Sequence, residues 1–155
     1  MTTLVMHGVI PRHVFGDHVA CLGSQLASLV ASIKAVEEPL SWYACDVEAT
    51  YRLTSSRFSN GDRPMPVGCS DDFEAMCLGV DQFRRGVFLA VPTRLAEPLL
   101  PDSMDTEDSD IENLRDASLE IRAFDTSYFL IATSRRSIVD LLHETFAMQS
   151  ASGAR

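Results

Sequence analysis

Apolar positions along the chain follow two periodicities, which together predict an alternation of strands and helices. Branched apolar residues over 3–10 predict a first strand, which Pro11 ends. From Asp17 to Pro39 the apolar residues recur at steps of three and four, the spacing of an amphipathic helix. Gly23 lies inside this predicted helix, where either another backbone approaches closely or the first turn is looser.

The middle of the chain predicts two strands with a loop and a helix between them. Residues 41–53 are rich in the aromatic and β-branched side chains that favour strands, although their alternation breaks near Asp46. Residues 55–69 hold an Asn-Gly-Asp triplet and two prolines, which predict a surface loop, and a helix with an acidic first turn follows. Gly86 is expected to interrupt the chain before 87–92, an apolar run typical of a central strand covered on both faces.

The last third of the chain predicts a hairpin followed by a helix. Apolar and charged side chains alternate over 119–123, and an Asp-Thr-Ser turn follows at 125–127, which together predict a half-buried antiparallel hairpin. A helix over 135–148 comes next. The whole order predicts an α+β fold: a single domain over residues 1–150, with a mixed, mostly antiparallel sheet of about five strands and about three helices, and a flexible tail at 151–155.

Composition and charge narrow the classes of function. The chain has 155 residues, of which 46% are hydrophobic and 23% charged, as in soluble globular domains. Its net charge of −9 argues against binding to the nucleic-acid backbone, because that mode needs a basic footprint. Because no apolar run is long enough to cross a bilayer and no secretory leader is recognisable, we expect a cytoplasmic protein without nucleic-acid or membrane partners.

The acidity is concentrated in one stretch, residues 97–116, which we call the acidic segment. It holds eight carboxylates against the single base Arg115, a net charge of −7, so the rest of the chain carries only −2. A solvated loop is the simplest interpretation of such a stretch. The alternative is electrostatic, because a dense negative surface speeds the capture of a basic partner and holds it by charged hydrogen bonds.

Signatures of catalysis and of metal binding are missing from the sequence. His13, Asp17 and His18 do not have the spacing of a helical zinc site, and the acidic segment lacks the glycine and the residue order of a calcium loop. Cys69 has no local signature of a nucleophile, and neither a glycine-rich phosphate loop nor a serine elbow is present. We therefore predict no catalytic residue, no metal and no cofactor.

Three stretches of the chain carry a resemblance to a known family: SWYACDVEA at 41–49, FRRGVFLAVP at 83–92, and LEIRAFDTSYFLIAT at 119–133, which leads into the last helix. Together they resemble small bacterial immunity proteins of polymorphic-toxin systems. The resemblance implies a cytoplasmic, single-domain and often acidic protein that binds one cognate toxin, in a family without shared catalytic residues.

The hypothesis from the sequence is an immunity-type protein that neutralises a basic toxin domain with its acidic surface. Reversing the charges of Asp105 and Asp108 should then weaken the association and leave the fold intact. The candidate partner-binding residues are six carboxylates, with two aromatic residues as anchors if they prove exposed: Asp102, Asp105, Glu107, Asp108, Asp110, Glu112, Trp42 and Tyr43.

Two other classes of function stay open. A regulatory or assembly subunit of a bacterial complex would have a similar composition and would expose an apolar groove. A small-molecule-binding enzyme domain would need a pocket with converging polar groups, for which the available residues are Asp46, Arg52, Arg57 and Asp125.

Overall fold

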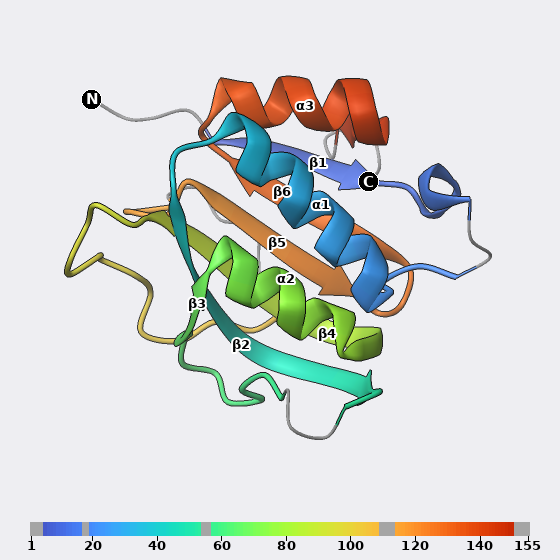
Figure 1. Ribbon diagram of the computed structural model, residues 1–155, viewed down its shortest axis with the longest axis horizontal. Helices are drawn as coiled ribbons and strands as arrows, with labels where there is room; N and C mark the ends of the chain where they lie inside the picture. The colour runs from blue at the N-terminus through green and yellow to red at the C-terminus, as the bar shows by residue number, and fades with distance from the viewer. Residues whose placement is uncertain (1–4, 17–18, 54–56, 109–113, 151–155) are drawn as a thin grey trace.

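The computed structural model describes residues 5–16, 19–53, 57–108 and 114–150. Within these residues three α-helices, one short 3₁₀ helix and seven strands follow one another (Figure 1). Their order is β1 (Met6–Ile10), η1 (Arg12–Phe15), α1 (Gly23–Val36), β2 (Leu40–Tyr51), β3 (Met65–Cys69), α2 (Ser70–Leu78), β4 (Val80–Pro92), β5 (Leu119–Phe124), β6 (Tyr128–Thr133), α3 (Arg136–Phe146) and β7 (Gln149–Ser150). The predicted α+β class is confirmed.

The strands of the described residues form one antiparallel sheet in the order β3-β2-β4-β5-β6-β1-β7. Six strands have five or more residues, one more than expected, and β7 has two. The unexpected long strand is β3, which lies where the sequence predicted a loop. Pro66 is tolerated there because β3 is an edge strand, whose outer side needs no N–H donor.

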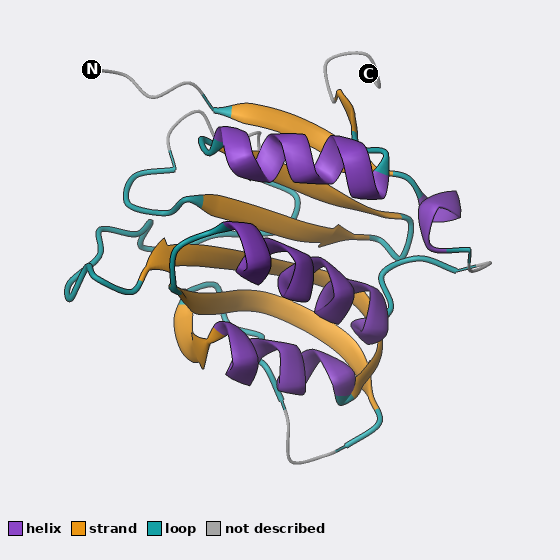
Figure 2. Cartoon of the chain, turned by 45° about the horizontal axis from the view of Figure 1, so that its top comes forward, coloured by secondary structure: helices purple, strands orange, loops and turns teal. Residues whose placement is uncertain are grey.

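The three helices cover one face of the sheet, which we call the helix face (Figure 2). Their apolar residues share one core with the sheet, and at its centre the rings of Trp42 and Phe73 lie edge to face, with centroids 4.4 Å apart. α1 begins at Gly23, where a Cβ atom would collide with the main-chain carbonyl oxygens of Cys77 and Val80. Close backbone approach is therefore the reason for the glycine. No helix in the described part of the chain is long and apolar enough to cross a membrane.

The central strand β4 runs through Gly86, where the sequence predicted an interruption. Gly86 pairs with Ala123 of β5, and a Cβ atom at Gly86 would come within 3.0 Å of the Phe88 ring. Glycine here leaves room for that ring and does not break the strand. The run 87–92 is buried and contributes to apolar clusters on both faces of the sheet, as predicted.

The face opposite the helices, which we call the second face, is also largely covered. β5 and β6 form the predicted hairpin, but its charged positions are not solvent-exposed: Glu120 and Arg122 are each 2% exposed. The prediction of a half-buried hairpin is wrong because another part of the chain covers this face. That covering part includes the acidic segment.

Candidate protein-binding site

The acidic segment lies against the second face of the sheet. Its described residues are 97–108 and 114–116. Met104 and Leu114 are buried in the apolar cluster of this face, together with Val87 and Leu89 of β4. Burying side chains of this size stabilises the packed arrangement by about 1.5 to 3 kcal/mol each. The described part of the segment is therefore a loop with exposed carboxylates, as the simplest interpretation predicted, but buried apolar residues anchor it on the sheet.

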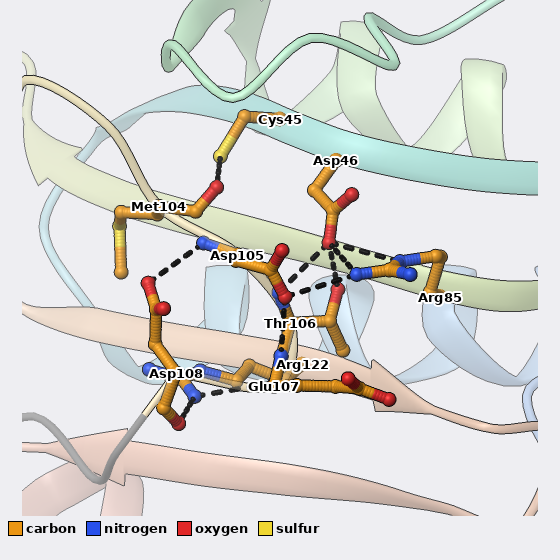
Figure 3. Close-up of polar contacts among 9 residues, drawn as sticks. All are labelled: Cys45, Asp46, Arg85, Met104, Asp105, Thr106, Glu107, Asp108 and Arg122. Carbon is orange, nitrogen blue, oxygen red and sulfur yellow. Dashed lines mark hydrogen bonds and ion pairs between the residues drawn. The ribbon is translucent and has the colours of Figure 1, made fainter.

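A single carboxylate oxygen, Oδ2 of Asp46, joins β2, β4 and the acidic segment (Figure 3). It accepts hydrogen bonds from Nε and Nη2 of Arg85 at 3.0 and 2.8 Å. It also accepts hydrogen bonds from the main-chain N and Oγ1 of Thr106 at 2.8 and 2.7 Å. Hydrogen bonds to a charged group are about twice as strong as neutral ones, so Asp46 holds the acidic segment in one position.

Asp46 reaches both neighbours because β2 departs from regular strand geometry at this residue. Its φ of 54° lies in the left-handed region, which Asp adopts more readily than most residues, and the register of β2 against β4 shifts around it. The Asp46 N–H donates to the Gly61 carbonyl at 2.7 Å. The carbonyl of the following residue, Asp62, accepts a hydrogen bond from the Met104 N–H at 2.7 Å. The connection between β2 and β3 therefore also holds the acidic segment.

A buried ion pair lies beneath the acidic segment. Nε of Arg122 is 2.8 Å from Oε1 of Glu120, and both side chains are 3% exposed. Nη1 of Arg122 also donates to the main-chain carbonyls of Asp108 at 2.7 Å and Thr106 at 3.3 Å. Burial raises the pKa of Glu120, and the charge of Arg122 offsets part of this effect. The pair therefore positions the segment from below and is itself too buried to contact a partner.

Two of the predicted partner-binding carboxylates, although exposed, accept hydrogen bonds from other residues of the chain. Asp105 accepts hydrogen bonds from Nη2 of Arg85 at 2.9 Å and from the Glu107 N–H at 2.8 Å. Asp108 accepts one from the Asp105 N–H at 2.8 Å. Reversing the charge of either residue would disturb the segment itself, so the expectation that these changes leave the fold intact is not supported.

Two other predicted carboxylates face solvent. Asp102 and Glu107 are exposed, and their carboxylates accept no hydrogen bond from the residues that the structure describes. The Glu107 side chain points away from the hydrogen-bonded cluster (Figure 3). Asp110 and Glu112 lie outside the described residues.

The two aromatic candidates lie on opposite faces of the sheet. Trp42 is fully buried in the helix-face core, where its Nε1 donates to Ser70 Oγ at 3.0 Å. It does not meet the condition of exposure that an anchor requires. Tyr43 is half-buried and packs against the apolar cluster of the second face. Of the two, only Tyr43 has a ring that a partner could reach.

The polar residues considered for a small-molecule site do not converge. Arg52 is paired with Asp81, and Arg57 lies over the Tyr51 ring at 5.4 Å from its centroid. Asp46 is engaged by Arg85 and Thr106 in the contacts above. Asp125 lines a hollow on the second face.

One of the four cysteines is exposed and the other three are buried. The exposed Cys69 thiol donates to Asp72 Oδ2 at 3.2 Å. Burial raises the pKa of both Cys21 and Cys45 to about 12, so neither is a thiolate at neutral pH. Among the described residues, which do not include Asp17 and His18, no three metal-binding side chains come together.

Sequence reasoning missed the residues that hold the site in place, which are Arg85, Thr106, Glu120 and Arg122. One signal was present, because the alternation of apolar positions in 41–53 breaks near Asp46 and such a break is typical of a bulge. The alternating charges at Glu120 and Arg122 gave the opposite impression, that of a solvent-exposed face.

No protein-family model, curated protein or solved structure matches the chain.

Proposed function

We propose that this protein is an immunity-type binding protein that neutralises a basic cognate toxin by docking it on the acidic segment. The observation that carries the proposal is that exposed carboxylates, those of Asp102 and Glu107, belong to a segment already held on the sheet. A backbone that is held before binding loses little conformational entropy when a partner docks. More of the electrostatic attraction of the carboxylates that it carries therefore contributes to affinity.

The charge distribution supports the same proposal. The acidic segment carries −7 of the total charge of −9, and its described residues lie over the second face of the sheet. Such a concentration of negative charge accelerates association with a basic surface, most strongly at low ionic strength. The proposal places the protein in the cytoplasm, and its four cysteines are free thiols, as is usual in a reducing compartment.

The proposal is tested by capture followed by a toxicity assay. Tagged protein is incubated at low salt with a lysate of cells that carry its gene, and bound proteins are eluted with salt and identified by mass spectrometry. Each basic protein recovered is then expressed alone and together with this protein. We expect one that arrests growth alone and is harmless when co-expressed, whereas recovery of harmless proteins only, or of none, would contradict neutralisation.

A matched pair of charge reversals ties the result to the acidic segment. Asp102→Lys changes an exposed carboxylate of that segment, and Glu144→Lys makes the same change on the exposed side of α3, on the helix face. Both variants alter the net charge equally. We expect Asp102→Lys to reduce capture and protection and Glu144→Lys to leave both unchanged, and equal effects would contradict docking on the acidic segment.

A further inference from the structure

A shallow groove lies on the second face, next to the acidic segment. It consists of two hollows that share Glu48 and Arg84, with volumes of about 110 and about 200 Å³. The smaller hollow is lined by Glu107 of the acidic segment and by Phe124 and Asp125, where β5 ends and turns toward β6. The larger one continues along the outer ends of β2 and β4. The groove therefore joins the acidic segment to a part of the sheet that the segment does not cover.

Three carboxylates from three separate elements line the smaller hollow. Glu48 belongs to β2, Glu107 to the acidic segment and Asp125 to the turn between β5 and β6. All three residues are exposed, and none of these carboxylates accepts a hydrogen bond from a described residue. The hollow therefore offers acceptors from three sides that the described part of the chain leaves unused.

An aromatic ring completes the lining of the hollow. Phe124 is half-buried and stacks on Tyr128, with ring centroids 5.4 Å apart and planes 12° from parallel. A ring held in this way can present its π-face to a planar cation, and cations attract such rings most strongly where water is partly excluded. Carboxylates beside an aromatic ring are the surroundings that a guanidinium group prefers.

Two arginines also line the hollow, and they differ in their partners. Arg85 is already paired with Asp46 and Asp105, so its charge is balanced inside the protein. Arg84 is exposed and forms no ion pair with any residue in the described ranges. The three carboxylates of the smaller hollow outweigh the single charge of Arg84. The groove therefore has a net negative charge, which favours a basic occupant over an acidic one.

We propose that this groove receives an arginine side chain of a protein partner, with the guanidinium group against Phe124 and hydrogen-bonded to Glu107 and Asp125. The inference rests on the proposed function and adds the chemistry by which the basic partner is recognised. Arginine suits the hollow better than lysine because its planar group stacks on a ring and donates to two carboxylates together. Arg84 opposes the bound charge from the rim of the groove.

The first test uses an arginine probe and its neutral isostere. N-acetyl-arginine amide and N-acetyl-citrulline amide are titrated separately into the 15N-labelled protein at constant ionic strength, up to the millimolar range expected for so small a ligand. We expect saturating shifts of the Phe124, Asp125 and Thr126 amides with the arginine probe and none with the citrulline probe. Non-saturating shifts, or equal responses to both probes, would overturn the proposal.

Charge variants of the groove provide a second test, because some should weaken binding of the arginine probe and another should strengthen it. Glu107→Gln combined with Asp125→Asn should weaken binding of the arginine probe by about five-fold or more, since both charged acceptors are lost. Asn suits position 125, where φ is 51°. Arg84→Gln should strengthen binding, because it removes a like charge from the rim. Unchanged binding in the double variant, or weaker binding in Arg84→Gln, contradicts an arginine site.

Failure of this inference can be distinguished from failure of the proposed function. Asp102 does not line either hollow, so Asp102→Lys tests the acidic segment without touching the groove. If the arginine probe does not bind while Asp102→Lys still reduces capture of a toxin, the arginine site in the groove is contradicted and the proposed function is supported. If the probe binds specifically and no toxin is captured, the arginine site is supported and the proposed function is contradicted.

Discussion

Nη1 of Arg122, in the middle of β5, donates a 2.7 Å hydrogen bond to the main-chain carbonyl of Asp108 in the acidic segment. The same guanidinium group is paired with Glu120 on the same strand at 2.8 Å. A charged side chain buried under a surface segment thus fixes that segment through its backbone, without engaging the carboxylates of the segment's described residues. Arg122 therefore contributes to the stability of the fold and also positions the segment that the proposed function uses.

Arg122→Met should therefore destabilise the protein strongly. The variant leaves the Glu120 charge buried without its partner, and breaking a buried pair in this way costs about 3 to 5 kcal/mol. Urea unfolding followed by the fluorescence of Trp42, the only tryptophan, measures the loss. In Glu120→Leu combined with Arg122→Met, most of the stability should return, while the Thr106 amide should exchange with solvent faster than in the wild type. A double variant as unstable as the single one would contradict the explanation.

The stability of the protein should carry a pH dependence that belongs to Glu120. Because burial raises the pKa of this group in the folded state, its contribution to stability is fully present below its pKa in the unfolded chain, near 4.5. The contribution is lost as the pH rises through the higher folded pKa. Glu120→Gln does not titrate, so its stability relative to the wild type should increase between about pH 4 and about pH 8. Urea unfolding of both proteins across this pH range tests the prediction. A difference in the free energy of unfolding that stays constant with pH would contradict the raised pKa of Glu120.

Asp46→Asn should loosen the acidic segment and lower the stability. Asparagine keeps the shape of the side chain and tolerates the φ of 54°, so the variant isolates the lost charge that faces Arg85 and Thr106. We expect a loss of about 1.5 to 3 kcal/mol in chemical unfolding, as for hydrogen bonds to charged groups. Glu48→Gln is the matched control: it neutralises an exposed carboxylate two residues away and should change the stability by less than about 0.5 kcal/mol. Equal effects of the two variants would contradict a special role of Asp46.

Gly23→Ala should destabilise the protein, although helix propensity alone predicts a gain of about 1 kcal/mol. The added methyl group would collide with the main-chain carbonyls of Cys77 and Val80, and these backbones can yield only if α1 separates from the end of α2 and the start of β4. We expect a net loss of about 1 to 3 kcal/mol, measured by thermal or urea unfolding. Gly61→Ala, where the nearest atom to the new methyl group is 3.6 Å away, serves as control and should cost less. A stabilised Gly23→Ala variant would show that the two backbones are not in close contact.

Local sequence patterns predicted the α+β class, the helix that begins at Ser70 and the β5–β6 hairpin, because apolar periodicity, an acidic first turn and turn residues are all local signals. The local patterns gave wrong predictions at two places, an interruption at Gly86 and a loop in place of β3. Whether a glycine breaks a strand or makes room for the Phe88 ring depends on residues that come close only in the fold. Pro66 indicates a loop unless the strand that contains it lies at an edge, and strand order cannot be read from a local pattern.

The candidate site was harder to predict because a surface segment covers it. Glu120 and Arg122 have the alternation of a solvent-exposed face. In the fold the acidic segment lies over this face, where Arg122 donates to the main-chain carbonyls of Thr106 and Asp108. The fold separates the carboxylates by role: Asp105 and Asp102 are both exposed, but Asp105 accepts hydrogen bonds within the chain, whereas Asp102 accepts none from a described residue. Composition located the charge correctly and could not assign these roles.

The affinity of Asp102→Lys for the captured toxin, measured by calorimetry at several salt concentrations, tests the central claim most directly. Docking on the acidic segment predicts at least about five-fold weaker binding than in the wild type at low salt, with a smaller difference at high salt. Glu144→Lys should bind as the wild type does. Equal affinities of Asp102→Lys and the wild type at every salt concentration would contradict the acidic segment as the binding surface.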